Sequence, residues 1–185
     1  QVPEIRRLRL SSIDSIEADD HLWDLIAGEP RFMPHLHLSL QHGDDLILKR
    51  MKRRHSSADA RAFCVRVRAL RPDASFGADM IAGFPTETED MFANAVGLAE
   101  DCGIAHLHVF PYSPRPGTPA ARMPQLDRAI VKDRASRLRE TGKRLHEAHL
   151  ASMIGRREMI LVENNGLAHT ENFTLVDAAG LKPRD

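Results

Sequence analysis

Two patterns of apolar and polar residues follow one another along this chain. One consists of short runs in which apolar and polar residues alternate, and the other of longer stretches in which apolar residues recur every three or four positions. The first pattern predicts β-strands and the second predicts amphipathic helices. Strands are expected at Ile5–Ser11, His35–Gln41, Ser75–Gly83 and His106–Tyr112. Helices are expected at Asp19–Ala27, Asp44–Met51, from Ser56 or Ser57 to Leu70, at Thr86–Cys102 and at Asp127–Met153. This alternation predicts an α/β fold with a parallel sheet.

The ends of two helices carry their own signals. Ser56 and Ser57 with Asp59 predict the N-cap of one helix. Thr86 and Glu89 have capping-box spacing at the start of the next, and Gly103 is placed to end it.

The pattern changes after residue 154. Glu158–Glu163 and Ala168–Val176 each predict a strand, and Asn164-Asn165-Gly166 between them is a hairpin signal. We therefore expect two domains, residues 1–154 and residues 155–185, the second being antiparallel.

The two faces of the parallel sheet differ in polarity. On the second strand Leu36, Leu38 and Leu40 share one face, and His35, His37, Ser39 and Gln41 share the other. All four strands show such a polar face, which predicts the concave side of an open barrel that holds a polar ligand. In parallel sheets ligands bind at the carboxyl ends of the strands. These ends are expected at Ser11, Gln41, Gly83 and Phe110.

Histidine, aspartate and arginine side chains on this face would also suit a metal. A hydrogen-bonded network that joins Arg7, Arg9 and Asp79 to the histidines is favoured, because buried charges need partners. No metal ligand and no catalytic residue is assigned.

The charge balance gives no overall nucleic-acid signal, because 26 Lys and Arg residues face 26 Asp and Glu residues in a chain of 185. Locally, Lys49–Arg54 reads KRMKRR, which suits either a solvated helix face or RNA. Cys64 and Cys102 are the only cysteines and are expected to be buried thiols in a reducing, cytoplasmic compartment. No apolar run is long enough to span a membrane.

Three blocks then become informative together: HLSLQHGDDLILKRMKRRH, ADMIAGFPTETEDMF and HLHVFPYSPRPGTPAARMP. In order and spacing they resemble the radical S-adenosylmethionine (SAM) methylthiotransferases. RLRLSSIDSIE and PHLHLSLQ favour the branch that methylthiolates threonylcarbamoyl-adenosine beside the tRNA anticodon. REMILVENN and HTENFTLV resemble the start of a TRAM domain, a small RNA-binding β-barrel.

The resemblance implies a fold and a set of roles. The fold would be a partial, open TIM-type barrel, present here as its last four βα units, followed by the start of a TRAM-like domain. SAM would be the cofactor, and the matching cofactor-binding positions are Ser11, Ser12, Ser39, Gln41, Gly83, Phe84, Pro85, Glu87 and Phe110. tRNA would be the partner, with Lys49, Lys52, Arg53 and Arg54 as candidate contacts. One departure is His42, where the family usually has a small residue.

The family's CxxxCxxC motif for a [4Fe–4S] cluster does not occur in this sequence, and two cysteines cannot supply three thiolates. The chain is therefore expected to be a fragment that supplies part of a SAM pocket and is inactive alone. Its open sheet edge is expected to favour self-association. Two alternatives remain, a ribosomal-protein methylthiotransferase and a non-catalytic RNA-binding module.

Overall fold

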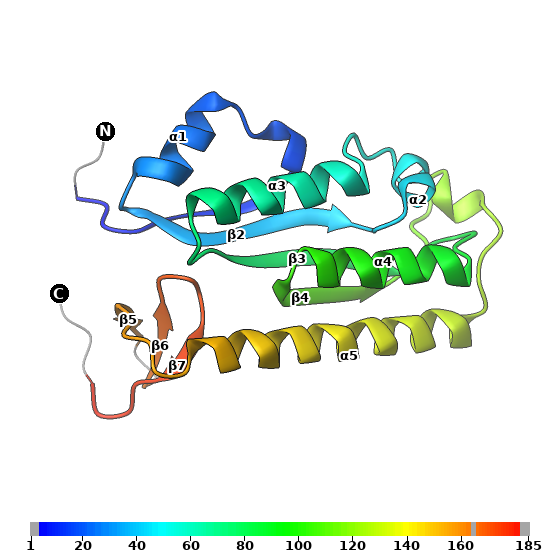
Figure 1. Ribbon diagram of the computed structural model, residues 1–185. Coiled ribbons are helices and arrows are strands. Elements are labelled where there is room, and N and C mark those ends of the chain that lie inside the picture. The colour runs from blue at the N-terminus through cyan, green and yellow to red at the C-terminus, as the bar shows by residue number, and fades with distance from the viewer. Residues whose placement is uncertain (1–3, 164–165, 182–185) are drawn as a thin grey trace.

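A four-stranded parallel sheet forms the centre of the computed structural model, which describes residues 4–163 and 166–181 (Figure 1). Its strands are β1 (Leu8–Ile13), β2 (Phe32–Gln41), β3 (Ser75–Ala82) and β4 (Ile104–Pro111), in the order β1-β2-β3-β4. The predicted α/β class is therefore confirmed.

The helices begin where side chains cap them. They are α1 (Asp20–Gly28), α2 (Asp45–Arg50), α3 (Ser57–Leu70), α4 (Glu89–Asp101) and α5 (Arg128–Met153), with short 3-10 turns at Ser15–Glu17 and Ala120–Arg122. Ser56 and Asp59 form a reciprocal capping box at α3, as predicted. The prediction for α4 was wrong, because Thr88 caps this helix by accepting from the Met91 N–H. Thr86 instead adopts a left-handed φ of 69° outside it.

The first two strands also differ from their predicted bounds. β1 starts three residues late, where the Leu8 N–H donates to the Arg31 carbonyl over 2.8 Å, and β2 starts three residues early. β2 thus runs through Pro34, which has no N–H for a ladder bond. The pairing with β1 passes from Phe32 directly to Leu36 at this point, so the proline disturbs no regular ladder position.

Helices cover the apolar face of the sheet. Leu36, Leu38 and Leu40 of β2 are buried there, as the alternation predicted. They join one hydrophobic core with Phe76 and Met80 of β3 and with apolar residues of α1, α3, α4 and α5. α5 runs beside β4 along one edge of the sheet (Figure 1). The opposite face, which carries His37, Ser39 and Gln41, is only partly covered; we call it the polar face.

A separate antiparallel sheet follows α5, with β5 (Ile160–Val162), β6 (Leu167–Thr170) and β7 (Leu175–Asp177). The single strand predicted at Ala168–Val176 was wrong, because a turn at Glu171–Thr174 divides it into β6 and β7. Phe173 in this turn has a φ of 69°, a backbone conformation that no regular strand contains. The predicted hairpin residues Asn164 and Asn165 lie outside the described residues.

The β6–β7 turn packs against the amino ends of the parallel strands (Figure 1). Arg9 donates to the carbonyls of Thr170 and Glu171 over 2.8 Å each, and the Ser75 hydroxyl donates to the Asn172 carbonyl over 2.5 Å. The Phe173 ring lies 4.7 Å from the ring of His35. The expected pairing of Arg9 with Asp79 is therefore replaced by contacts to the antiparallel sheet β5-β6-β7, which we call the small sheet.

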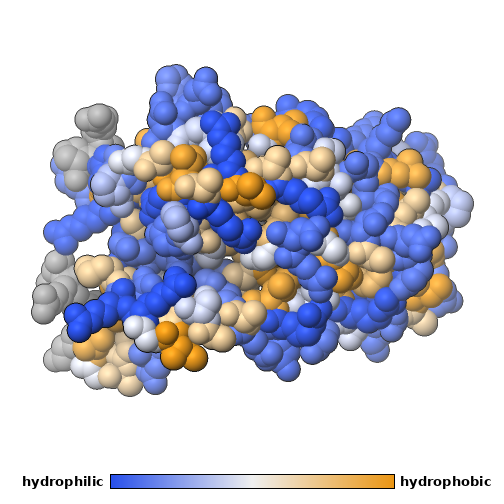
Figure 2. All heavy atoms as spheres, in the orientation of Figure 1, coloured by the Kyte–Doolittle hydropathy of each residue, from blue (hydrophilic) through white to orange (hydrophobic). Residues whose placement is uncertain are grey.

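The surface seen in Figure 2 is largely hydrophilic, with apolar residues in scattered groups. Among the helices described, none combines the length and the apolar character that crossing a bilayer requires.

Candidate functional site

Left-handed backbone conformations gather at the carboxyl ends of the parallel strands. Ser12 at the end of β1 has a φ of 58°, Gln41 at the end of β2 has 63°, and Gly83 directly after β3 has 78°. Lys52 in the loop after α2 has 58°. Non-glycine residues in this region cost roughly 1–3 kcal/mol each and concentrate at functional sites. The carboxyl ends are therefore the part of the fold in which a ligand site is expected.

A cavity of about 480 Å³, which we call the carboxyl-edge cavity, lies at these ends. Ile81, Phe84 and Tyr112 give it apolar and aromatic walls. Its polar lining comes from Gln41, Arg50, Lys52, Arg53, Arg115 and Thr118, among others. A volume of this size and an aromatic wall with a few polar groups are typical of cofactor pockets.

Tyr112 has a feature that points to a ligand. Its hydroxyl oxygen is buried and has no hydrogen-bond partner among the described residues, and burial raises the pKa of this phenol. The ring packs edge-on against Phe84 with 5.3 Å between centroids. A buried hydroxyl without a partner is rare in a stable fold. A polar ligand group in the carboxyl-edge cavity would satisfy it.

A smaller cavity of about 230 Å³ lies beside the first and shares Lys52 and Arg53 with it. Ser12 and Ser39 line this second cavity. Arg53 separates the two, because its Nη2 donates to the Ser39 carbonyl over 3.0 Å and to Asp14 over 3.1 Å. Ser12, Ser39 and Gln41 thus come together at one edge, as their strand-end positions suggested.

Glu87 lies behind the site rather than in it. Its side chain is fully buried, and the Gly83 N–H donates to its Oε2 over 2.9 Å. Arg134 of α5 donates to the same oxygen over 2.8 Å, and His42 Nε2 is 2.7 Å from Oε1. His42 Nδ1 accepts from the Asp44 N–H, so the Nε2–H donates the hydrogen bond to Glu87 Oε1. Glu87 therefore acts on a ligand only by holding the Gly83 turn.

The remaining assigned positions lie in different surroundings. Phe84 lines the carboxyl-edge cavity and Pro85 is buried in the turn beside it. Ser11 and Phe110 are exposed, and neither side chain lines this cavity.

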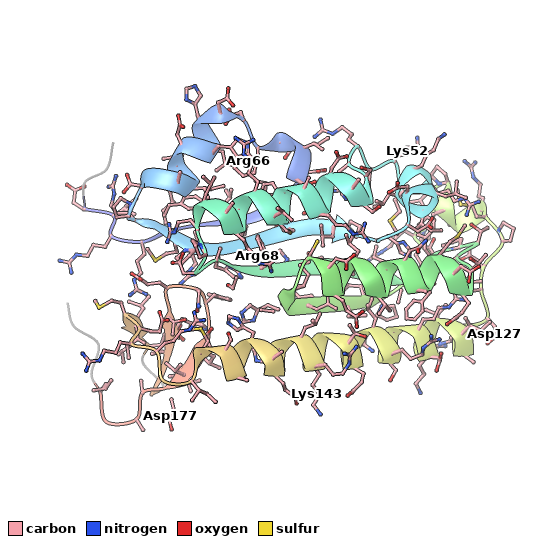
Figure 3. All side chains as sticks on the ribbon, viewed as in Figure 1. Lys52, Arg66, Arg68, Asp127, Lys143 and Asp177 are labelled. Atoms are coloured by element: carbon pink, nitrogen blue, oxygen red, sulfur yellow. The ribbon has the colours of Figure 1, made fainter. Side chains whose placement is uncertain are left out.

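The four candidate RNA contacts are not equivalent. Lys52 lies at the end of the sheet opposite Asp177 of the small sheet, as Figure 3 shows, and it lines both cavities. Arg53 is engaged with Asp14 and Ser39, and Arg54 forms an ion pair with Glu17. Lys49 is exposed and makes no ion pair with any residue that the structure describes. Lys49 and Lys52 are therefore the side chains most available to a phosphate.

Sequence reasoning missed several residues of the carboxyl-edge cavity, among them Arg50, Tyr112 and Arg115. Arg50 donates to the Thr86 hydroxyl over 2.7 Å and so holds a strained turn. Tyr112 follows β4 directly, and Arg115 lies three residues further along the chain. Both stand in the FPYSPRPG run that the sequence singled out, so their position after a strand end was the available signal.

Histidines crowd the polar face away from these cavities. His37 Nε2 lies 3.0 Å and His108 Nδ1 lies 3.2 Å from the same oxygen of Asp79. Nearer the small sheet, burial lowers the pKa of His35 to about 3, and burial with His146 and His149 nearby lowers that of His106 to about 4. Both imidazoles are therefore neutral at pH 7.

The two cysteines lie behind the sheet, on α3 and at the end of α4, and both are buried as predicted. A hydrogen bond between the thiols raises the pKa of Cys64, with burial adding to it, and lowers the pKa of Cys102. Two buried thiols on this side of the sheet do not fit the [4Fe–4S] cluster that the sequence resemblance implies, because its CxxxCxxC motif supplies three thiolates.

Comparison with known proteins shows which sequences and structures this chain resembles. A sequence model of the radical SAM superfamily matches residues 2–99. The chain is 56% identical over 172 residues to the threonylcarbamoyladenosine tRNA methylthiotransferase MtaB of Rickettsia prowazekii, covering 93% of this chain and 41% of that protein. It is 37% identical to the Thermotoga maritima protein of the same name, over 88% of this chain and 38% of that one.

A third relative, the tRNA-2-methylthio-N(6)-dimethylallyladenosine synthase of Erythrobacter litoralis, is 36% identical over 89% of this chain and 37% of its own length. The chain thus spans about two fifths of these relatives. Among solved structures, coproporphyrinogen III oxidase (HemN) from Escherichia coli, a radical SAM enzyme, superposes with a TM-score of 0.55 at 18% identity. That likeness covers 74% of this chain and 32% of the oxidase, and it concerns the fold alone.

Proposed function

The chain belongs to the radical SAM superfamily, and on this premise we propose that it is part of a methylthiotransferase that modifies threonylcarbamoyl-adenosine in tRNA. The observation that carries the proposal is the 56% identity to the Rickettsia protein over 93% of this chain. The relatives that act on dimethylallyladenosine support a second candidate substrate at 36–39% identity. The higher identity favours threonylcarbamoyl-adenosine.

The fold supports the same proposal. We assign residues 1–154 to the last four βα units of a partial TIM-type barrel and residues 155–185 to the start of a TRAM-like domain. A parallel sheet with one polar face suits the first assignment, and a separate antiparallel sheet after α5 suits the second.

We place the adenosine side of SAM in the carboxyl-edge cavity. Gln41 and Phe84 line it, Gly83 forms the turn that leads into Phe84, and the Tyr112 hydroxyl offers an unused hydrogen bond. Ser12 and Ser39 in the adjoining cavity are assigned to the ribose or methionine side. When bound, SAM supplies the radical chemistry and the methyl group. The residues of this chain position it and exclude water.

The cluster that such chemistry needs has no place among these residues. Cys64 and Cys102 are buried under helices, on the far side of the sheet from the polar face. We therefore propose that this chain binds part of SAM but does not cleave it alone. Lys49 and Lys52 are proposed as tRNA phosphate contacts, because they are the least engaged of the four basic candidates Lys49, Lys52, Arg53 and Arg54.

Two measurements test the proposal. Titration calorimetry of the chain with SAM is expected to show binding that Gln41→Ala and Tyr112→Phe weaken and that Val65→Ala, at an exposed position on α3, leaves unchanged. Deleting the gene that encodes the chain is expected to remove the methylthio group from threonylcarbamoyl-adenosine in cellular tRNA, as read by mass spectrometry of nucleosides. Loss of the group from dimethylallyladenosine, or from a ribosomal protein, would instead support the alternative substrates.

A further inference from the structure

We propose that His37, Asp79 and His108 form a binding site for a divalent transition-metal ion on the polar face of the sheet. The site goes beyond the proposed function, which assigns no metal to these side chains. The sequence-based expectation of a network that joins Arg7, Arg9 and Asp79 to the histidines is confirmed for His37 and His108. It was wrong for the pairing of Asp79 with arginine, because Arg9 donates to the Thr170 and Glu171 carbonyls instead.

Three adjacent parallel strands carry the three side chains. His37 lies on β2, Asp79 on β3 and His108 on β4. Asp79 and His108 are register partners, and His37 pairs with Gly77, two residues before Asp79 on the same face. β2 and β3 are inner strands of the sheet and β4 is an edge strand along which α5 packs, so the backbone of each residue is fixed. The three groups therefore lie on a rigid surface rather than on mobile loops, as a metal site requires.

The donor atoms are spaced as ligands. His37 Nε2 and His108 Nδ1 lie 3.0 and 3.2 Å from Asp79 Oδ1, and one donor atom from each residue lies within 4.8 Å of the other two. Ligand bonds of about 2.0–2.2 Å in tetrahedral geometry separate donor atoms by roughly 3.3–3.6 Å. Small side-chain rotations would therefore admit an ion.

The charge of Asp79 has no permanent counter-ion. Other enclosed carboxylates of this fold pair with arginine, Glu87 with Arg134 and Asp14 with Arg53. In the described part of the chain Asp79 pairs only with the two imidazoles and with no Lys or Arg. A neutral imidazole donates a hydrogen bond but adds no positive charge. A divalent cation between the three groups would supply the missing charge.

Gly77 gives the His37 ring its place. A Cβ at this position would lie 2.7 Å from His37 Nδ1, so any larger residue would displace the ring. The exposed fractions of the three side chains rise from 15% for His37 through 31% for Asp79 to 60% for His108. The site is therefore closed toward the sheet and open toward the polar face, where water or a ligand could complete the coordination.

Two nitrogens and one carboxylate oxygen suit Zn²⁺, Co²⁺ or Fe²⁺ rather than Mg²⁺ or Ca²⁺, which prefer oxygen ligands. Three protein ligands with an open position are typical of sites at which a metal binds an exchangeable ligand.

Titration of the chain with Zn²⁺ by calorimetry tests the proposal, with Co²⁺ as a spectroscopic probe. We expect one ion per chain, and with Co²⁺ visible absorption bands of four- or five-coordinate geometry. His108→Ala and Asp79→Asn are each expected to weaken Zn²⁺ binding by at least about tenfold, because loss of even an outer-shell partner has effects of this size. His21→Ala removes an exposed histidine on α1 and serves as the matched control, with no change expected.

His108 is the decisive position, because its largely exposed side chain can be removed without a cavity in the core. Circular dichroism checks that each variant is folded. Absence of stoichiometric Zn²⁺ binding by the wild-type chain would overturn the proposal. Equal affinity in the wild type and in folded His108→Ala would also overturn it, since the ion would then be held by other residues.

Discussion

His42 Nε2 lies 2.7 Å from Glu87 Oε1, and solvent reaches neither side chain. Through Glu87 this pair joins the end of β2 to the Gly83 turn and to Arg134 of α5. His42, which the sequence resemblance singled out as a departure from the family pattern, is thus part of the network behind the proposed SAM site. The network explains how a histidine is accommodated there, since both of its ring nitrogens have partners.

Replacing Glu87 by Gln is expected to destabilise the fold by about 3–5 kcal/mol, because it leaves the buried Arg134 guanidinium without its main counter-charge. Glu89→Gln is the matched control. Glu89 also pairs with Arg134, but it is largely exposed, so its loss should cost no more than about 1 kcal/mol. Urea unfolding measures both. Similar losses in the two variants would contradict the central role of the buried pair.

Gly43 is expected to tolerate no side chain. A Cβ there would lie 2.3 Å from the Asn94 carbonyl oxygen and 2.6 Å from Ala95 Cα, both backbone atoms of α4 that cannot rotate away. Gly43→Ala should therefore cost at least about 1–3 kcal/mol. Gly97→Ala, in α4 with no neighbour within 4 Å of the new Cβ, should instead stabilise by roughly 0.5–1 kcal/mol. Thermal unfolding of both variants checks the opposite signs.

Neither cysteine is expected to react with a thiol reagent in the folded protein. Cys64 is 1% exposed, Cys102 is 0% exposed, and the raised pKa of Cys64 disfavours its thiolate. Only exposed thiolates react quickly. Both should be labelled after denaturation, which mass spectrometry of the alkylated chain would show. Rapid labelling of Cys102 under native conditions would mean that the contact between α3 and α4 opens.

Acid should loosen the contact between α5 and the small sheet. Burial, with His146 and Arg156 nearby, lowers the pKa of His149 below its usual 6.5, and Nε2 lies 2.8 Å from the Thr174 hydroxyl. The His106 ring faces it from β4. His149 therefore binds a proton more readily in the unfolded state than in the folded state. The stabilisation by neutral His149 is present above pH 6.5 and is lost as the pH falls.

Urea unfolding between pH 7.5 and 5.5 measures this loss. The wild type should lose more stability over this range than His149→Gln, which keeps a polar side chain but does not titrate. Because the other histidines are common to both proteins, the difference reports His149 together with its effect on the pKa of His106. Parallel pH profiles would count against the assignment.

The open edge of the parallel sheet is expected to cause self-association. Among the strands that the structure describes, β1 pairs only with β2, and Leu8 on this edge is 46% exposed. The opposite edge is covered, since α5 packs along β4. Leu8→Lys places a charge on the open edge and should shift the chain toward monomer. Light scattering over a range of concentrations tests this, and a wild-type chain that stays monomeric at high concentration would refute it.

The structure confirms what local spacing alone can specify. Side-chain alternation along β2 separates Leu36, Leu38 and Leu40 from His37, Ser39 and Gln41 without any knowledge of neighbouring strands. The capping box of Ser56 and Asp59 and the closing Gly103, with a φ of 53°, depend on residues a few positions apart. For α4 the capping-box spacing of Thr86 and Glu89 predicted the wrong N-cap, because Thr88 caps this helix.

Long-range partners decided the rest. The sequence placed Asp79 and the histidines on one face but did not give the register between β2, β3 and β4, which brings Asp79 to His37 and His108 and leaves Arg9 to the small sheet. The sequence marked Glu87 as a site residue. Only the packing against α5 shows that its carboxylate oxygens already accept hydrogen bonds from Arg134, His42 and the Gly83 N–H. Alternation and caps are fixed by the chain's own geometry, whereas the partner of a charge is fixed by which distant side chains the fold brings within hydrogen-bond distance.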